Sequence, residues 1–418
     1  MEKLVKLSKT IRNNWKKSVF GALAIYYAGV KGKEKYDISI LMTAACKEAV
    51  KHGDSLIEWN KNPTLVTVIL NPVANKRSAK QDYEKYCEPL LHLAGLQVDV
   101  IQTQSEGNAK EIVESLSGTQ AIIVAGGDGT LSETVTGLLR RNDEANRFPI
   151  GLLPLGRTNA LGNSLFPGGN GVEKVKQLIE ACMAIIKGET VLKDAMKIEP
   201  ISQEGDTPTK PIYAMSSFEW GAFRDVMARK DKYWFYGSLR KYATYIFNGY
   251  KDSITWDCSG TIKYTPPCLG CSNCVAKKPE VKRKWSFFSQ NLQAAATEEL
   301  DTNPDCATVT EMCFKTCEFQ IKTRNIDPVD EPALNIFIGK NKYSYTDFVS
   351  EGFRRIKSKE QGDQRIKVRT IELIPKEVSE DKMVEIDSEE FEVKPVKITL
   401  LPKVIKLFYN SEINTLKT

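Results

Sequence analysis

Hydrophobic residues between positions 63 and 188 follow two alternating patterns. Short aliphatic runs predict strands at residues 65–70, 97–103, 121–124 and 149–153. Between and after them, apolar residues recur with helical spacing, which predicts helices at residues 80–94, 108–117, 132–141 and 172–187. Strands that alternate with helices build a parallel sheet with helices on both faces. Residues 63–188 are therefore expected to form a three-layer α/β domain.

After residue 188 the helical spacing gives way to short strands of alternating polarity. They are expected at residues 195–199, 212–218, 255–264, 310–321, 334–338, 367–373, 383–393, 396–400 and 404–408. This pattern is typical of an antiparallel β-sandwich, here over residues 189–410 with a short tail at 411–418. A chain of 418 residues also exceeds the size at which a single core usually stops growing.

A glycine-rich turn follows the third expected strand, in the sequence AIIVAGGDGTLSE at residues 121–133. Glycines at such a turn let backbone N–H groups approach a phosphate, and the start of the next helix favours an anion. Asp128 lies in the middle of the turn, where a carboxylate implies a bridging Mg²⁺ or a hydroxyl group to be oriented. The alternative is an ordinary tight turn between a strand and a helix.

Two further loops support the phosphate-binding interpretation. Residues 71–77 (NPVANKR) follow the first strand, and residues 154–159 (PLGRTN) follow the fourth strand. Because the carboxyl ends of parallel strands meet at one edge of a sheet, all three loops are expected to lie together where such folds bind ligands.

The motifs NP-x₃-K, GGDGT and P-x-G-x-T-N, in this order, resemble those of the diacylglycerol and sphingosine kinase family, which is related more distantly to NAD kinases. The resemblance covers roughly residues 63–408. The segments FEWG at 218–221 and IDSEE at 386–390 make the chain most similar to the acylglycerol kinases of mitochondria. The resemblance to this family implies an ATP-binding α/β domain, a β-rich second domain and an active site in the cleft between them.

The resemblance also implies roles for individual residues. Glu389 is expected to be the catalytic base, with Asp225 near the acceptor hydroxyl and Asp128 as the third catalytic residue. Asp387 and Glu389 stand where the family has a D-G-E motif, with Ser388 in place of glycine, and an alternating strand would put both carboxylates on one face. The residues expected to bind ATP are Asn71, Thr103, Gly126, Gly127, Asp128, Gly129, Thr130, Gly156, Thr158, Lys232, Arg240 and Asp387, with Asp128 and Asp387 as magnesium ligands.

The N-terminal 62 residues form a basic leader. Residues 1–40 hold nine Lys/Arg against three acidic residues, so their net charge of +6 equals that of the whole chain. Residues 18–30 are uncharged but shorter than the ~20 residues of an ordinary spanning helix. A secretory signal, a mitochondrial targeting segment and a retained membrane anchor are all compatible with this pattern. The resemblance favours the mitochondrial inner membrane, with the kinase facing the intermembrane space, and residues 38–59 are expected to form a spacer helix.

Composition excludes several classes of protein. The two histidines, His52 and His92, lie outside every motif, which argues against a serine-type triad and against histidine-based zinc catalysis. Residues 41–418 are formally neutral, so no nucleic-acid partner is expected.

Cysteines cluster in an insertion at about residues 265–310. Cys268, Cys271 and Cys274 are spaced C-x₂-C-x₂-C, and Cys258, Cys306, Cys313 and Cys317 lie nearby in the sequence. Such spacing fits zinc or disulfides, and a second pair of zinc ligands would have to come from residues 306–317.

The sequence therefore predicts an ATP- and Mg²⁺-dependent lipid kinase that phosphorylates mono- and diacylglycerol to lysophosphatidic and phosphatidic acid. Ceramide and sphingosine are further possible acceptors. One alternative is a membrane-tethered assembly subunit of a mitochondrial inner-membrane carrier import complex, with or without kinase activity. A less favoured alternative is an NAD kinase, which shares GGDGT but would not need the leader.

Overall fold

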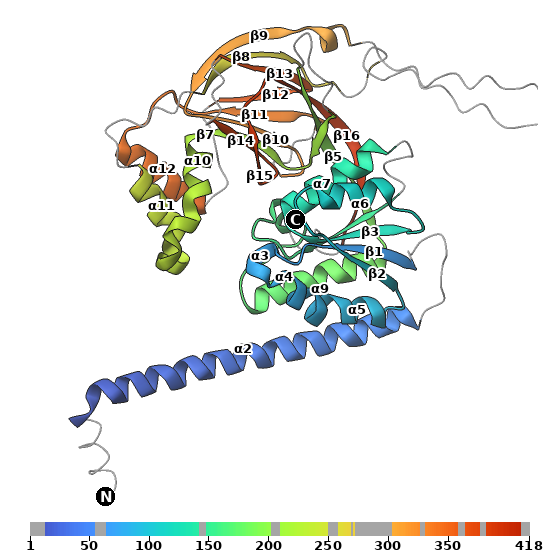
Figure 1. Cartoon of the computed structure of the whole chain (residues 1–418), viewed down its shortest axis with the longest axis vertical. Coiled ribbons are helices and arrows are strands. Elements are labelled where there is room, and N and C mark those ends of the chain that lie inside the picture. The colour runs from blue at the N-terminus through green and yellow to red at the C-terminus, as the bar shows by residue number, and fades with distance from the viewer. Residues whose placement is uncertain are drawn as a thin grey trace, which may run out of the picture.

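The computed structural model describes residues 13–54, 64–141, 148–201, 210–249, 258–268, 271, 303–326, 331–357, 364–376 and 382–410 (Figure 1). Cys274, the insertion residues 275–302 and the tail at 411–418 lie outside these ranges, as do residues 1–12 of the leader.

The expected parallel sheet is confirmed. Its strands are β1 (Leu65–Leu70), β2 (Gln97–Gln102), β3 (Ala121–Gly126) and β4 (Ile150–Pro154), in the order β2-β1-β3-β4. Every residue of β3 and β4 is buried, as their continuous apolar sequences require of strands covered on both faces.

Helices cover this sheet. They are α3 (Ala74–Arg77), α4 (Ala79–Asp82), α5 (Glu88–Leu93), α6 (Asn108–Ser115), α7 (Asp128–Arg140), α8 (Ala160–Leu165) and α9 (Val172–Lys187). The single helix expected at residues 80–94 is interrupted by a π-helical turn, η1 (Tyr83–Cys87), before the proline in the first turn of α5. Helix α7 begins at Asp128 and not at Ser132, so Asp128 is a helical residue rather than a loop residue.

The remaining strands form the expected antiparallel sandwich. They are β5 (Thr190–Pro200), β6 (Ile212–Ala214), β7 (Ser217–Gly221), β8 (Cys258–Thr265), β9 (Thr310–Thr316), β10 (Glu318–Thr323), β11 (Leu334–Ile338), β12 (Gln364–Val368), β13 (Thr370–Pro375), β14 (Met383–Ile386), β15 (Glu389–Glu392) and β16 (Val396–Phe408). One sheet has the order β12-β11-β10-β7-β14-β15. The other has the order β16-β13-β8-β9, with β5 beside β16 and β6 beside β5, and the two sheets enclose a common core.

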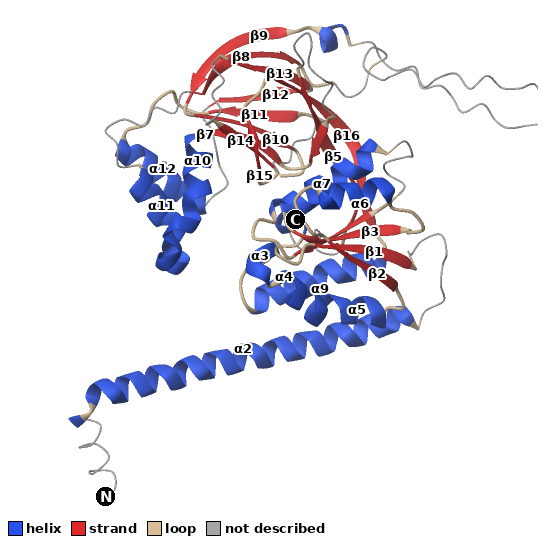
Figure 2. Ribbon diagram, viewed as in Figure 1, coloured by secondary structure: helices blue, strands red, loops and turns tan. Residues whose placement is uncertain are grey.

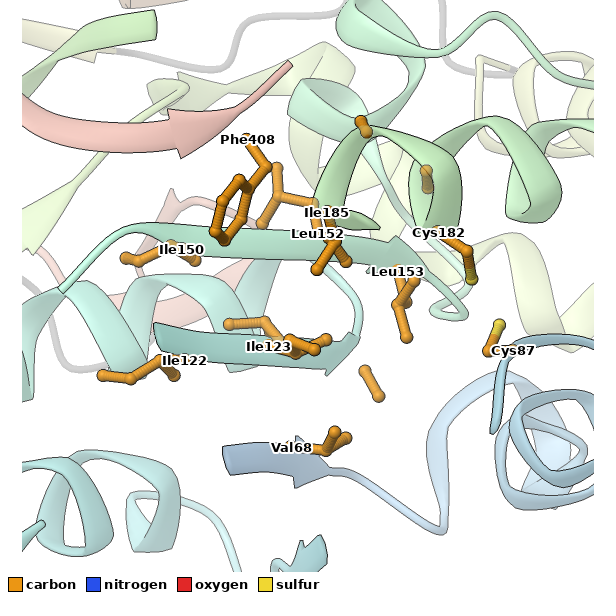
Figure 3. Close-up of a cluster of buried hydrophobic side chains, with 14 of the residues drawn as sticks. Val68, Cys87, Ile122, Ile123, Ile150, Leu152, Leu153, Cys182, Ile185 and Phe408 are labelled. Carbon is orange, nitrogen blue, oxygen red and sulfur yellow. The ribbon is translucent and has the colours of Figure 1, made fainter. Parts of the chain in front are cut away.

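Strand β16 joins the sandwich to the parallel sheet. Two strands were expected over this region, but the structure has one strand of 13 residues whose pairing with β5 shifts between Leu401 and Ile405. Near its end β16 pairs in parallel with β4, at Leu407 and Ile150. Phe408 lies beside Leu152 and Ile185 in the core of the α/β part (Figure 3). Strand β16 thereby fixes the sandwich to the parallel sheet.

A helical unit that the sequence did not predict projects from the sandwich (Figure 2). It contains α10 (Ala222–Ala228), the 3₁₀ segment η3 (Arg229–Leu239), α11 (Arg240–Asn248) and α12 (Tyr345–Lys357). Phe223 stacks on Phe348 in its small separate core, and the guanidinium of Arg355 lies 3.7 Å from the centre of the Phe223 ring. A further 3₁₀ turn, η4 (Pro304–Ala307), precedes β9.

The leader forms one long helix, α2 (Trp15–Gly53), which extends away from the body in Figure 1. Its C-terminal part packs on α5 and α9 and buries Ala45 and Ala49. Its N-terminal part exposes large apolar side chains, including Phe20, Ile25 and Tyr26. Among the described residues, no helix combines the length and the apolar character that crossing a bilayer requires.

Candidate active site

The glycine-rich turn after β3 and the loop after β4 are in backbone contact. The Gly156 N–H donates to the carbonyl of Gly126 at 2.8 Å. A Cβ on Gly156 would lie 2.2 Å from the Cα of Gly127, and a Cβ on Gly127 would lie 2.8 Å from the carbonyl oxygen of Thr158. Neither position therefore accepts a side chain, and the glycines of the two motifs are needed for one close approach between loops.

Asp128 holds the two loops together at the start of α7. Both of its carboxylate oxygens accept from the Ala160 N–H, at 2.8 and 2.9 Å, and its own N–H donates to the carbonyl of Thr158 at 3.1 Å. The Thr158 hydroxyl also donates to the carboxylate. Burial raises the pKa of Asp128, although these hydrogen bonds oppose the shift.

The loop after β1 reaches the same edge of the sheet. The Asn71 amide donates to the hydroxyl of Thr130 at 3.2 Å, which ties this loop to α7. Thr103, directly after β2, donates its N–H to the carbonyl of Leu70 at 2.9 Å. The structure thus brings most of the expected ATP-binding residues together and leaves Thr103 one strand further out.

Asp387 and Ser388 form the tight turn between β14 and β15, with φ angles of 46° and 72°. The expectation that one alternating strand carries Asp387 and Glu389 on a common face is therefore wrong. Left-handed backbone at these two successive residues ends the alternation of side chains between the two faces of the strand. The same backbone occurs in two-residue hairpin turns, which favour Asp or Asn followed by glycine.

The Asp387 side chain points into the protein. Its carboxylate accepts from the N–H groups of Met215, Ser216 and Ser217 at 2.7 to 2.9 Å, and burial raises its pKa to about 7. The Ser388 hydroxyl donates to Asp128. This contact, which the sequence did not reveal, links the sandwich to the glycine-rich turn.

The carboxylates of Asp128 and Asp387, the predicted magnesium ligands, already accept from backbone N–H groups. Backbone N–H groups occupy both carboxylate oxygens of Asp128 and of Asp387, and an N–H that points at an oxygen excludes a cation from that direction. The magnesium site at Asp128 and Asp387 stays a prediction, and we derive no step through a metal held there.

Glu389 begins β15 and places its carboxyl group over the glycine-rich turn. Its Oε1 lies 2.8 Å from where a Cβ on Gly129 would stand. Glu133, on the next turn of α7, is hydrogen-bonded to Glu389 and accepts from the N–H groups of Gly107 and Ala109 at 2.8 and 3.0 Å. Burial, followed by the charges of Glu133 and Glu106, raises the pKa of Glu389 to about 8. Glu389 is therefore mostly protonated at neutral pH in the chain without ligands.

Asp225 belongs to a separate group of charges around Arg224. The buried Arg224 guanidinium pairs with Asp225 at 2.8 Å, with Glu385 at 3.5 Å and with Glu390. Burial raises the pKa of Asp225, and it raises that of Glu385 to about 7. Sequence reasoning named Asp225 alone and missed Arg224, the adjacent residue, which holds three acidic side chains together.

Basic residues of the helical unit approach the loop after β4. Asp231 pairs with Arg157 of that loop and, at 3.4 Å, with Arg240. Burial lowers the pKa of Lys230, as does the neighbouring charge of Arg157. Lys232 is exposed, and Arg157 and Lys230 are the cations that the sequence did not single out.

Comparisons with known proteins identify relatives of both the α/β part and the sandwich. Residues 65–198 match the diacylglycerol kinase catalytic domain, and residues 215–416 match the acylglycerol kinase C-terminal family. The mitochondrial acylglycerol kinase of Homo sapiens is 36% identical over 420 residues, which cover 96% of this chain and 95% of the relative. That of Xenopus laevis is 32% identical over 96% of this chain and 94% of the relative.

Sphingosine kinase 1 of Arabidopsis thaliana is 31% identical over 43% of this chain and 36% of its own length. A putative diacylglycerol kinase from Bacillus anthracis superposes with a TM-score of 0.52 at 18% identity, over 84% of this chain and 99% of that chain, which shows a shared fold. On the identity and coverage of the first two relatives, the chain belongs to the acylglycerol kinase family and is a lipid kinase.

Proposed function

We propose that the chain transfers the γ-phosphoryl group of ATP to a hydroxyl group of mono- or diacylglycerol, with Glu389 as the base. One observation carries the proposal: the Glu389 carboxyl group of the sandwich lies directly over Gly129 at the start of α7. A phosphate bound to the glycine-rich turn and a proton acceptor are thereby within one site, as phosphoryl transfer requires.

The ATP phosphates would lie against the Gly126–Gly129 backbone. Gly129 and Thr130 place their N–H groups in the first turn of α7, where the helix dipole favours negative charge. Arg157, Lys230 and Arg240 border the same region and supply positive charge for the triphosphate. Magnesium would arrive as the counter-ion of ATP and neutralise charge on its phosphates.

The proton transfer falls to Glu389. In its ionised form the carboxylate takes the proton of the lipid hydroxyl, the lipid oxygen bonds to the γ-phosphorus, and the bond from that phosphorus to the β–γ bridging oxygen breaks to release ADP. A base with a pKa near the working pH is well matched to this task. Burial is the main cause of the raised pKa of Glu389 and the neighbouring Glu133 charge adds to it, so we assign Glu133 as a positioning residue of the site.

The acceptor would reach the site along the helical unit. Trp234, Phe235 and Leu239 of η3 expose 72, 63 and 60% of their surface, and Phe247 of α11 exposes 50%. An apolar face beside Lys230 and Arg240 suits the acyl chains of a lipid held in a membrane surface. We therefore assign the lipid contact to this exposed face of η3 and α11.

We place this activity at the mitochondrial membrane, because the relatives that cover nearly the whole chain are named as mitochondrial and α2 exposes an aromatic and aliphatic N-terminal half. The finer assignment, the inner membrane facing the intermembrane space, rests on the family resemblance. So does a second role as a subunit of a carrier import complex, for which the exposed half of α2 is the available surface.

A panel of acceptors incubated with radiolabelled ATP tests the proposal. Monoacylglycerol, diacylglycerol, ceramide, sphingosine and NAD⁺ are supplied separately, each with wild-type chain, Glu389→Gln and the control Glu392→Gln. Glu392 lies on the same strand with an exposed side chain paired to Lys394. We expect acylglycerol labelling that Glu389→Gln lowers by orders of magnitude and Glu392→Gln preserves. Labelling of NAD⁺ alone, or equal rates in the two variants, would refute the assignment.

A further inference from the structure

Three buried cysteines form a cluster far from the active-site loops. Cys268 follows β8, Cys271 comes three residues later, and Cys306 belongs to η4 before β9. Their sulfur atoms all lie within 4.8 Å of one another, and the Sγ atoms of Cys271 and Cys306 are 3.2 Å apart. Cysteines 35 residues apart in the sequence thus lie side by side next to the paired strands β8 and β9.

Ordinary core packing does not account for this cluster. Among the described residues, the three cysteines form a buried group of their own that contains no other buried apolar side chain. Cys87 and Cys182, by contrast, are packed within the large core of the α/β part, and Cys258 lies within the core of the sandwich. Within the described part of the chain, these three thiols therefore belong to neither of the large hydrophobic cores, and their burial together needs a different reason.

The spacing of the sulfur atoms suits a shared cation. Tetrahedral zinc with bonds of about 2.3 Å holds its thiolates about 3.8 Å apart, within the range seen here, whereas a disulfide needs about 2.0 Å and uses only two of the three sulfurs. Cys268 and Cys271 form the C-x₂-C chelate common in zinc sites, and Cys306 supplies a ligand from a distant segment.

A polar side chain also contacts one of the three sulfur atoms. The Asn303 amide Nδ2 donates to the Sγ of Cys268 at 3.7 Å. The same side chain caps η4, since its Oδ1 accepts from the Asp305 N–H at 3.0 Å, so one residue orients the turn that carries Cys306 and also contacts a sulfur ligand. Polar donors to ligating sulfurs are a regular feature of metal–thiolate sites.

We propose that Cys268, Cys271 and Cys306 bind one structural Zn²⁺. The ion joins the end of β8 to the start of β9, beyond their last paired residues Tyr264 and Thr310, and so closes the base of the insertion between them. Soft thiolate ligands select zinc over magnesium, so this site is chemically distinct from the kinase centre. The argument does not depend on Cys274, which lies outside the described residues.

Metal analysis of the full-length chain, purified under reducing conditions, tests this inference. We expect elemental analysis by mass spectrometry to find about one zinc ion per chain. Cys271→Ser and Cys306→Ser should each lose most of the zinc. Cys313→Ser is the matched control, because Cys313 is exposed on β9 and outside the cluster, and it should keep the full amount.

Thiol labelling of the wild-type chain gives a readout that does not depend on how the variants fold. With zinc bound, Cys268, Cys271 and Cys306 should resist iodoacetamide, and a strong zinc chelator should make all three reactive while Cys313 reacts throughout. A metal-free chain, a different bound metal, or a Cys271–Cys306 disulfide peptide in non-reducing digests would overturn the proposal.

Discussion

Glu389 of the sandwich is hydrogen-bonded to Glu133 of the nucleotide-binding helix α7. Two acidic side chains from different parts of the chain meet here, because two backbone N–H groups hold Glu133 and Glu389 is partly buried beside it. The contact places the base at the phosphate loop and also makes the stability of the chain without ligands depend on pH.

The pH dependence has a definite sign. The folded chain keeps a proton on Glu389 up to about pH 8, whereas an unfolded glutamate releases it near its ordinary pKa of about 4.5. Between these values the folded state binds more protons, so rising pH lowers the free energy of unfolding. We expect the Tm to fall between pH 5 and pH 8, and Glu389→Gln to flatten this fall and raise the Tm at pH 8.

Burial raises the pKa of Asp387 and of Glu385 to about 7, so these two groups also lower the Tm as the pH rises. Glu389→Gln should therefore remove only part of the pH dependence of the Tm. Glu392→Gln is the control, since the pKa of Glu392 lies below its ordinary value and cannot act in this window. Thermal melts of the three chains at matched ionic strength measure the effect. A wild-type Tm that does not fall across the window would contradict the protonated Glu389.

The contact between glycine loops predicts a severe effect for Gly156→Ala. The added methyl group would stand 2.2 Å from the Cα of Gly127, so the two loops must separate and the hydrogen bond from Gly156 to Gly126 is lost. We expect ATP affinity to fall by at least about tenfold, which corresponds to about 1.4 kcal/mol. Gly32→Ala in α2 meets no atom within 4 Å and should leave ATP binding unchanged. Equilibrium binding of a fluorescent ATP analogue compares the two.

Ser388 combines an unfavourable backbone with a useful hydroxyl group. Its φ of 72° costs a residue with a side chain about 1 kcal/mol or more, and its hydrogen bond to Asp128 returns a similar amount. Ser388→Gly should therefore leave the Tm nearly unchanged and lower turnover, because Asp128 loses a partner. Ser388→Ala keeps the unfavourable φ but loses the hydrogen bond, so its Tm should be lower than that of the wild type and of Ser388→Gly. If Ser388→Ala melts as the wild type does, the hydroxyl group contributes no stability.

The parallel sheet was predictable because its strands are buried on both faces and read as plain aliphatic runs, as in β3 and β4. The helical unit was not predictable, because its small core brings together Phe223, Tyr245 and Phe348, aromatic residues that are far apart in the sequence. The spacing of apolar residues within one segment cannot predict a core that is assembled from such distant segments.

The candidate active site was also only partly predictable from the sequence. The glycine motifs and Glu389 could be named from the sequence, since each carries a local signature. The orientation of Asp387 could not, because it depends on two left-handed residues and on N–H groups from residues 215–217. Nor could the partnership of Glu389 with Glu133, which joins elements more than 250 residues apart.

The exposed aromatic face of η3 predicts how the enzyme meets its lipid. Trp234 and Phe235 expose most of their surface and lie next to Asp231, which is joined to the catalytic part through Arg157. Replacing both aromatic residues by alanine removes apolar area that would enter a membrane surface, without altering the phosphate loop.

We expect the double variant Trp234→Ala, Phe235→Ala to phosphorylate diacylglycerol in vesicles at least about tenfold more slowly, a change of about 1.4 kcal/mol in the barrier. A short-chain diacylglycerol dissolved in buffer should be phosphorylated at nearly the wild-type rate, because its capture needs no membrane. Val309→Ala, at an exposed apolar residue before β9, controls for a general loss of surface hydrophobicity. Equal losses on vesicles and on the dissolved lipid would assign these aromatic residues to folding or catalysis rather than to the membrane.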